Sequence, residues 1–232
     1  MIHLLRSPAL APGPGYDRVA GSYDNWNWQS FWDRNEEPLV ESVLRGMATP
    51  SQALDLGTGT GRYLRLLKEL GVHSAIGLDV STGMLAVARQ RRESHRLVRA
   101  DMRAIPIAPN CLDLIIAARS LCHIPELDSA FRQIAVSLRP GGTLIVTELD
   151  ADHAFQTTKA PTADGEVTIA TWKRPTTEIV RAAAREGLVS TRIIRVRATD
   201  CRWLPPPSEL SSIDRTGRRA IFSVAIFSKL SS

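Results

Sequence analysis

Three aspartates and a glycine-rich turn are the residues of this sequence whose types and spacing best support chemistry. Asp55 closes a short apolar run and leads into the turn 57–61, which carries three glycines. Such glycines let a backbone adopt positive φ angles and approach a ligand closely. Asp79 and Asp101 close the next two apolar runs. If the runs are parallel strands, their carboxyl ends share one edge of a sheet and the aspartates face one ligand, although a cap or turn role explains any one of them alone.

The glycine spacing separates two kinds of nucleotide-like ligand. A dinucleotide fingerprint G-x-G-x-x-G would need its third glycine at Arg62, and no Gly-Lys-Ser/Thr ending is present. Asp55 at the strand end would repel a pyrophosphate, but it suits a ligand with positive charge. S-adenosylmethionine carries a sulfonium and an ammonium group. At residues 53–62 the sequence resembles motif I of the class I S-adenosylmethionine-dependent methyltransferases.

Further motifs extend this resemblance over residues 16–149. Residues 79–85 resemble the family's D-x-S-x-x-M-L turn, with Ser81 as the expected helix N-cap, and residues 138–142 resemble its L-x-P-G-G turn. Residues 16–24 resemble the segment that covers the cofactor in the ubiquinone/menaquinone-methyltransferase-like (methyltransferase type 11) branch. The resemblance implies that Asp79 binds the ribose diol and Asp101 the adenine amino group. The cofactor-binding residues that we expect are Asp55, Gly57, Thr58, Gly59, Gly61, Asp79, Val80, Met84, Asp101, Met102, Arg119 and Tyr23.

Two histidines at the ends of later apolar runs are candidates for a catalytic base. His123 follows the expected fourth strand and matches a histidine common in the quinone-methyltransferase-like branch; it could remove a proton or orient its loop. His153 follows the fifth strand, beside Asp150 and Asp152, and is the first candidate for a general base. Turn chemistry explains these acids equally well. Arg119 could pair with a substrate carboxylate or phosphate, or with a neighbouring acid.

Aromatic residues crowd into the segment before the first strand. Tyr16 is expected near the methionine half of the cofactor or the acceptor, and Trp26 and Trp28 follow. These tryptophans either line a lid over an apolar acceptor or anchor the lid helix to the sheet. For Phe31 and Trp32 the core role is favoured. The substrate-side residues that we expect are Tyr16, Trp26, Trp28 and Asp150.

The resemblance implies an α/β, Rossmann-like fold. The expected sheet has seven mostly parallel strands in the order 3-2-1-4-5-7-6, with strand 7 antiparallel and helices on both faces. Residues 1–15 are expected to be flexible or extended, and 165–173 to add a strand or hairpin over the cleft. Expected strands lie at 53–56, 74–79, 97–102, 112–117, 143–149, 190–197 and 220–229, and expected helices at 38–47, 62–70, 128–138 and 176–186.

The bulk composition fits one domain. The chain has 232 residues, 44% hydrophobic and 23% charged, with a net charge of +5. We expect a single domain over 1–232, with an N-terminal helical lid at 1–47, a cofactor-binding core at 53–149 and a substrate-side segment with the last strands at 150–232. Three widely spaced cysteines suggest neither a disulfide framework nor a metal site. Without an apolar run of about 18 residues or a secretory signal, we expect no membrane span and a cytoplasmic location.

The expected activity is transfer of a methyl group from S-adenosylmethionine to O, N or C of a small acceptor, favoured to be an aromatic compound or natural product of secondary metabolism. Amino methyltransferases of nucleic acids and glutamine often carry an Asn/Asp-Pro-Pro-Tyr/Phe run, which is absent here. A peptide, protein or tRNA acceptor is the main alternative, and the basic run 89–92 either ends a solvated helix or touches a polyanion. Another alternative is an S-adenosylmethionine-binding protein of this fold with a non-methylating role. A monomer or a homodimer is expected.

Overall fold

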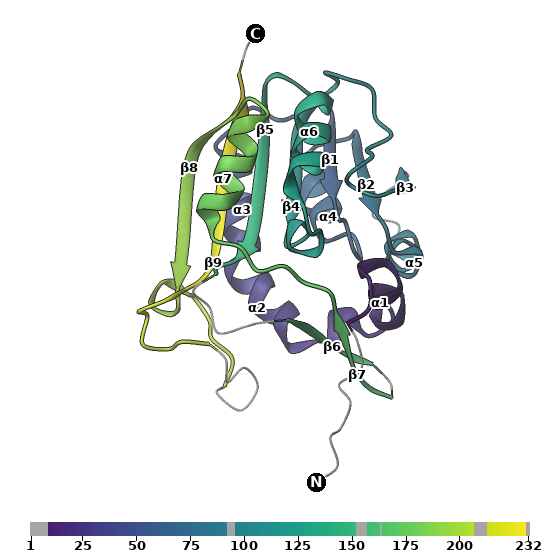
Figure 1. The fold of residues 1–232 in the computed structure, drawn as a ribbon, viewed down its shortest axis with the longest axis vertical. Coiled ribbons are helices and arrows are strands. Elements are labelled where there is room, and N and C mark those ends of the chain that lie inside the picture. Colours follow the sequence, from purple (N-terminus) through teal and green to yellow (C-terminus); the bar gives the residue numbers. More distant parts are fainter. Residues whose placement is uncertain (1–8, 92–95, 152–156, 163, 207–212, 231–232) are drawn as a thin grey trace.

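A seven-stranded sheet forms the centre of the computed structural model, which describes residues 9–91, 96–151, 157–162, 164–206 and 213–230. Its order is β3-β2-β1-β4-β5-β9-β8 (Figure 1). The first five are mutually parallel, whereas β9 is antiparallel to both β5 and β8. With the sheet strands numbered in chain order, this confirms the predicted order 3-2-1-4-5-7-6. The strands are β1 (Ala53–Leu56), β2 (Ala75–Asp79), β3 (Leu97–Arg99), β4 (Leu112–Ala118), β5 (Leu138–Leu149), β8 (Leu188–Arg197) and β9 (Ala220–Lys229).

Helices cover both faces of this sheet (Figure 1). On one face, α2 (Asn27–Asn35), α3 (Glu37–Arg45) and α4 (Arg62–Glu69) share an apolar core with β1, β4, β5 and β9. On the other, α6 (Leu127–Ser137) and α7 (Thr176–Arg185) pack over the same strands. The central strands β1 and β4 read as continuous apolar runs because both of their faces are buried, as expected in a parallel sheet. Helix α5 (Thr82–Gln90) lies beside β2 and β3, and its N-cap Ser81 accepts a hydrogen bond from Met84 N at 3.1 Å, as predicted.

A second, two-stranded sheet lies apart from the first and forms a cover with the N-terminal helix. Strand β6 (Thr158–Thr162) pairs antiparallel with β7 (Gly165–Ile169), which confirms the predicted hairpin. Leu10 adds a bridge to Ile169, and α1 (Pro12–Val19) packs against both strands. Figure 1 shows α1 and this hairpin at one end of the central sheet.

The prediction of flexible or extended chain over 1–15 was wrong for residues 12–15, which form the first turn of α1; residues 1–8 lie outside the described part. Proline suits a first helical turn because its fixed φ is helical and its missing N–H has no partner there. Gly15 allows close packing, since a Cβ on it would lie 2.8 Å from a side-chain carbon of Ile169. A composition typical of a loop therefore marks a tightly packed helix.

Two strand boundaries also differ from prediction. β5 begins at Leu138, which pairs with Leu112, and not at residue 143. The segment 139–142, expected as a turn, forms an irregularity inside the strand, with Gly141 at φ 75°. β3 ends at Arg99, so Asp101 lies just beyond the strand rather than at its last position. Short helices η1 (Tyr23–Asn25), η2 (Leu121–His123) and η3 (Ala198–Asp200) complete the described elements.

Candidate active site

A cavity of about 440 Å³ lies at the carboxyl ends of β1, β2 and β4, between the sheet edge and helix α1. Its walls come from three regions of the chain: the strand ends with their loops, the segment that begins at Ala11, and Trp172 after the β6–β7 hairpin. Nine of the predicted cofactor-binding residues and two further predicted site residues line this cavity. Those lining residues are Gly57, Gly59, Asp79, Val80, Met84, Asp101, Met102, Arg119, Tyr23, Tyr16 and His123.

The glycine turn forms the floor of the cavity. Gly57, Gly59 and Gly61 have φ angles of 82°, 55° and 94°, the left-handed region that side chains disfavour. A Cβ on Gly57 would lie 2.4 Å from Ser120 Cβ, so this position tolerates no side chain. A Cβ on Gly59 would meet nothing within 4 Å and would project into free space. The backbone at Gly59 is therefore open to a ligand.

Asp55 lies beneath this turn and does not line the cavity. It is 1% exposed, and its Oδ2 accepts a hydrogen bond from Thr58 Oγ1 at 2.6 Å. Burial raises the pKa of Asp55 to about 7. Asp55 and Thr58 thus contact each other and fix the shape of the turn. Gly61, the N-cap of α4, is likewise absent from the cavity wall.

Asp79 offers the cavity a carboxylate held by two backbone donors. Gly59 N–H donates to its Oδ2 and Ser81 N–H to its Oδ1, both at 2.8 Å. Burial raises the pKa of this carboxyl. Each oxygen retains a further lone pair, so the group can accept from two adjacent hydroxyls. This arrangement fits the ribose diol of an adenosine ligand.

Asp101 and Met102 line the cavity. The Asp101 carboxylate accepts from Arg103 Nε at 2.9 Å and Arg103 Nη2 at 2.6 Å. The hydrogen bond from Arg103 lowers the pKa of Asp101, so it stays ionised. Arg103 therefore orients the carboxylate that the family resemblance assigns to the adenine amino group.

Tyr16 and His123 form a hydrogen-bonded pair in the wall of the cavity. Tyr16 OH lies 2.8 Å from His123 Nε2, and His123 Nδ1 lies 2.8 Å from Ala170 O. Because a carbonyl can only accept, Nδ1 carries the proton and Nε2 accepts from Tyr16. Burial lowers the pKa of His123 to about 4 and raises that of Tyr16. The imidazole is therefore neutral at pH 7, and its basic nitrogen is engaged.

Arg119, the first residue after β4, joins the cavity to helix α3. Its Nε donates to both carboxylate oxygens of Glu36 at 3.1 Å, and its guanidinium lies 4.7 Å from the centre of the Trp32 ring. Glu36 is fully buried and also accepts from Tyr63 OH at 3.0 Å and Thr147 Oγ1 at 2.5 Å. Sequence analysis did not single out Glu36, because a lone glutamate between two short helices carries no spacing signal.

Two aspartates of the N-terminal segment fasten the cover to the cofactor-binding core. Asp17 accepts from Ser81 Oγ and Gly83 N, both at 2.7 Å, at the start of α5. Asp24 accepts from Thr60 Oγ1 at 2.9 Å and pairs with Arg91. Sequence analysis quoted both residues only as part of the segment 16–24. Their contacts explain how this segment is held above the glycine turn.

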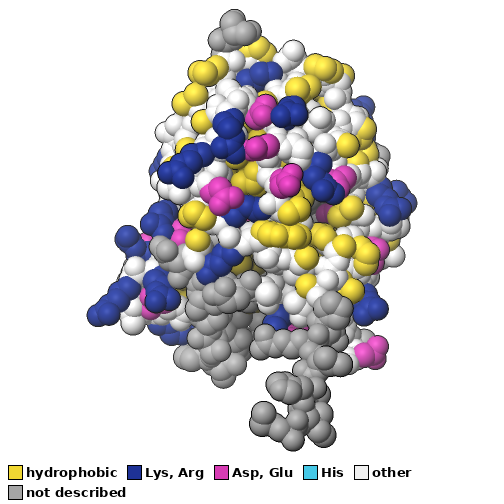
Figure 2. All heavy atoms as spheres, viewed as in Figure 1, with side chains coloured by type: hydrophobic (Ala, Val, Ile, Leu, Met, Phe, Trp, Pro, Cys, Tyr) yellow, Lys and Arg dark blue, Asp and Glu magenta, His cyan; other side chains and the backbone are white. Residues whose placement is uncertain are grey.

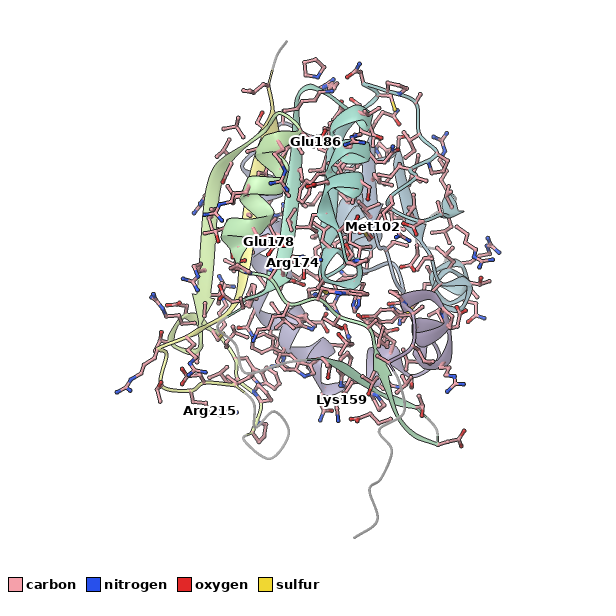
Figure 3. The ribbon with its side chains drawn as sticks, in the orientation of Figure 1. Met102, Lys159, Arg174, Glu178, Glu186 and Arg215 are labelled. Carbon is pink, nitrogen blue, oxygen red and sulfur yellow. The ribbon has the colours of Figure 1, made fainter. Side chains whose placement is uncertain are left out.

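Arg174 fixes the loop that contains His123, and sequence analysis missed it. It is 9% exposed, and its Nη2 donates to Ile124 O at 2.6 Å and Pro125 O at 2.5 Å. Its Nε pairs with Glu178 at 3.0 Å, where the chain enters α7 (Figure 3). A side chain that binds carbonyls leaves no motif in the sequence, so only the structure reveals it.

Three expected substrate-side residues lie elsewhere than predicted. Trp28 is 4% exposed and stacks on Trp32 with ring centres 5.3 Å apart, so we reassign it to the core. Trp26 packs on Tyr23 and is absent from the cavity wall. Asp150 is 3% exposed and pairs with Arg195 of β8 at 2.9 Å, so its role is structural.

The expected base His153, with Asp152, lies outside the described residues. The structure adds Trp172 to the aromatic wall, on the same side as Tyr16 and His123. Asp113 accepts from Ser51 N and Gln52 N and pairs with Arg139, so it holds the start of β1 and β4 together outside the cavity. Within the described ranges no cluster of histidine, cysteine and acidic residues could hold a metal ion, and no helix is long and apolar enough to cross a membrane.

The sequence of the cofactor-binding core matches a known family. Residues 54–146 match the family model described as "Methyltransferase domain". This part of the chain is therefore similar to methyltransferase domains. This agrees with the resemblance found in the motifs, and the family and fold imply S-adenosylmethionine as the cofactor. The carboxylate of Asp79 and the open backbone at Gly59 fit an adenosine-bearing ligand.

Curated relatives of this chain differ in their acceptors. The chain is 31% identical over 144 residues to a malonyl-[acyl-carrier protein] O-methyltransferase of Serratia marcescens, covering 61% of this chain and 53% of the relative. It is 30% identical over 141 residues to a demethylmenaquinone methyltransferase of Thermotoga maritima, covering 58% of this chain and 59% of the relative. The chain thus spans little more than half the length of these relatives.

Solved structures share the fold over nearly the whole chain. An S-adenosylmethionine-dependent methyltransferase from Mesorhizobium loti has a TM-score of 0.66 at 21% identity, covering 84% of this chain and 97% of that chain. The [4+2]-cyclase SpnF has a TM-score of 0.71 at 21% identity, covering 97% of this chain and 100% of that chain. At these identities the likeness shows the fold alone.

Proposed function

We propose that this protein transfers a methyl group from S-adenosylmethionine to a small acceptor, favoured to be aromatic. The observation that carries the proposal is the cavity roofed by α1. Its volume of about 440 Å³ lies within the range of small-molecule sites. Residues 11–14, 16 and 17 form part of its wall. A small acceptor fits such a site.

Two kinds of side chain line the cavity. Asp79 and Asp101 favour the adenosine part of the cofactor, while Tyr16, His123 and Trp172 supply an aromatic wall. The cofactor, when bound, supplies an activated methyl group on a sulfonium that a nucleophile displaces in line. The protein then aligns the acceptor and excludes water from the site.

The neutral state of His123 bears on the kind of nucleophile. Its Nε2 lone pair accepts from Tyr16, and a pKa of about 4 makes it a weak base at pH 7. An acceptor that has already lost its proton, such as a carboxylate or an acidic phenol, suits this environment. His153 remains a candidate base for acceptors that retain a proton. We assign Tyr16 and His123 to orienting the acceptor.

A labelling experiment tests this function. Purified protein, S-adenosylmethionine labelled on its methyl group, and a cleared extract of the source cells are incubated, and the label is divided between solvent-soluble and acid-precipitable fractions. We expect soluble label that gives a product mass. Tyr16→Phe should lower this transfer with little change in S-adenosylhomocysteine affinity, because only the aromatic wall is altered. Transfer at the wild-type rate in this variant would remove the Tyr16–His123 pair from the acceptor site.

A basic surface favours a second candidate, an acceptor carried on a polyanion such as tRNA or an acidic protein. Dark-blue side chains gather over the lower end of β8 and the segment after it (Figure 2). The described acidic residues near it are Asp200, Asp214 and the buried Asp150, which pairs with Arg195. Such a surface attracts polyanions at low salt. The exposed arginines of this surface are Arg192, Arg195, Arg197, Arg202, Arg215, Arg218 and Arg219.

The same labelling experiment separates the candidates. Label in the precipitate that is removed by ribonuclease indicates tRNA, and label removed by protease indicates a protein acceptor. Confirmed cofactor binding without label in either fraction would favour a non-methylating role, for which the fold shared with a [4+2]-cyclase leaves room.

A further inference from the structure

Arg119 has an unusual setting for a surface-loop arginine. Its φ of 53° is a left-handed conformation, which is unfavourable for a non-glycine residue. Its N–H donates to Thr147 O at 2.7 Å, and its side chain is 15% exposed. The surrounding structure therefore holds both its backbone and its guanidinium in place.

Only part of the guanidinium is used by the protein. Nε donates to Glu36, whereas the terminal nitrogens Nη1 and Nη2 have no hydrogen-bond partner among the residues that the structure describes. Arg119 lines the cavity together with Tyr16, Tyr23 and His123. A guanidinium offers its donors as a planar fork that matches a carboxylate. The unused face of this fork is thus available to a ligand in the cavity.

Glu36 holds the Arg119 guanidinium in place without accepting a hydrogen bond from its terminal nitrogens. Its two oxygens accept from Arg119 Nε, Tyr63 OH and Thr147 Oγ1, so the buried carboxylate is satisfied. Burial opposes the charge of Arg119, but the Glu36 carboxylate together with Tyr23, Tyr63 and Tyr16 outweighs burial and raises its pKa. Stacking on Trp32 fixes the plane of the guanidinium. The terminal nitrogens therefore keep their charge and direction in an empty or a filled cavity.

We propose that Arg119 binds a carboxylate in the cavity through its terminal guanidinium nitrogens, with Glu36 as the positioning residue. The inference rests on the proposed function, because it takes the cofactor and the acceptor as the ligands of the cavity. Two sources offer this group: the methionine half of the cofactor, and an acceptor that is a carboxylic acid. In either case Arg119 sets the position of a ligand that the aromatic wall alone cannot orient.

Ligand titration with Arg119→Gln tests the proposal without turnover. S-adenosylhomocysteine and 5′-methylthioadenosine share the nucleoside and sulfur, but only the former has the carboxylate. If Arg119 binds the cofactor, the variant loses at least tenfold affinity for S-adenosylhomocysteine and keeps that for methylthioadenosine. If Arg119 binds the acceptor, the variant keeps its affinity for both nucleosides. A panel of small acids (malonate, trans-aconitate, benzoate) is then titrated into protein saturated with S-adenosylhomocysteine, and at least one acid binds the variant at least tenfold more weakly than wild type.

Arg62→Gln is the matched control. Arg62 is buried to a similar degree, with a side chain 13% exposed, but its terminal nitrogens are engaged by Asp33, Glu37 and Gln29. Arg62→Gln should lower the free energy of unfolding without changing the ratio of the affinities for S-adenosylhomocysteine and methylthioadenosine. Glu36→Gln should produce the same ligand selectivity change as Arg119→Gln in weaker form, which a merely structural role would not.

The remaining variants guard against misfolding and separate this inference from the proposed function. The double variant with Arg119→Gln and Glu36→Gln leaves no unpaired buried charge, and it should fold yet still lack the carboxylate preference. The proposal is overturned if Arg119→Gln binds S-adenosylhomocysteine within twofold of wild type and no acid in the panel prefers the wild type. Because these are binding measurements, a protein that methylates nothing in the extract can still support or overturn the role of Arg119.

Discussion

The Asp79 carboxylate offers the sharpest test of how this cavity recognises its cofactor. Its two oxygens each accept one backbone N–H, from Gly59 and Ser81 at 2.8 Å, and each retains a lone pair for one ligand hydroxyl. Hydrogen bonds to a charged group are worth about 1.5–3 kcal/mol each. Two of them amount to about 3–6 kcal/mol. Asp79→Ala should therefore weaken S-adenosylhomocysteine binding roughly a hundredfold to ten-thousandfold.

Calorimetric titration of a ligand pair isolates the hydroxyl contacts from general damage. The wild type should discriminate 5′-methylthioadenosine from its 2′,3′-dideoxy analogue, and Asp79→Ala should bind both equally weakly. Asp79→Asn guards against collapse of the glycine turn, because its amide oxygen can still accept from one backbone N–H. Asp101→Ala is the control, since its carboxylate is held by Arg103 and should not affect this discrimination. A folded Asp79→Ala protein that binds S-adenosylhomocysteine within threefold of wild type would refute the ribose assignment.

Two buried titratable side chains and two tryptophans give further tests. Burial raises the pKa of Glu148 to about 7, so Glu148→Gln should gain about 3 kcal/mol of stability relative to wild type as pH rises from 4 to 7. The pKa of His123 is lowered to about 4, so His123→Gln should gain stability relative to wild type as pH falls from 6.5 to 4. Both predictions are checked by urea melts, and a variant whose free energy of unfolding changes with pH in the same way as that of wild type would contradict its prediction. Trp28→Ala should cost about 3–5 kcal/mol in the same melts, whereas Trp172→Ala, 38% exposed, should cost far less; equal losses would argue against Trp28 as a core residue.

The sheet and the cofactor-binding residues were predictable because their physics is local. Parallel strands that are buried on both faces require apolar runs, and a close approach of backbone to ligand requires glycines. The sequence of 53–62 and 75–84 therefore predicts their roles directly. Ser81 likewise indicates a helix start, because its side chain accepts a hydrogen bond from the backbone N–H three residues later. These elements agree with the structure within a residue or two.

The aromatic wall and Arg119 were less predictable because their contacts join distant parts of the chain. His123 meets Tyr16 and Ala170, and Arg119 meets Glu36, pairs separated by 47 to 107 residues. No spacing rule encodes such pairs. Trp28 shows the converse error, since an aromatic residue near a lid looks the same in sequence whether it faces a ligand or Trp32.

The cover of the cavity has a consequence for how such proteins diversify. Leu10 exchanges backbone hydrogen bonds with Thr168 and Ala170, and Gly15 packs on Ile169, so α1 and the β6–β7 hairpin form one packed module. Both pieces lie outside residues 54–146, the span that matches the family. Descendants could therefore exchange this module while inheriting the sheet unchanged. Grafting residues 9–25 together with 157–172 from a relative should then transplant acceptor preference, whereas grafting either piece alone should break the Gly15–Ile169 contact and cost stability.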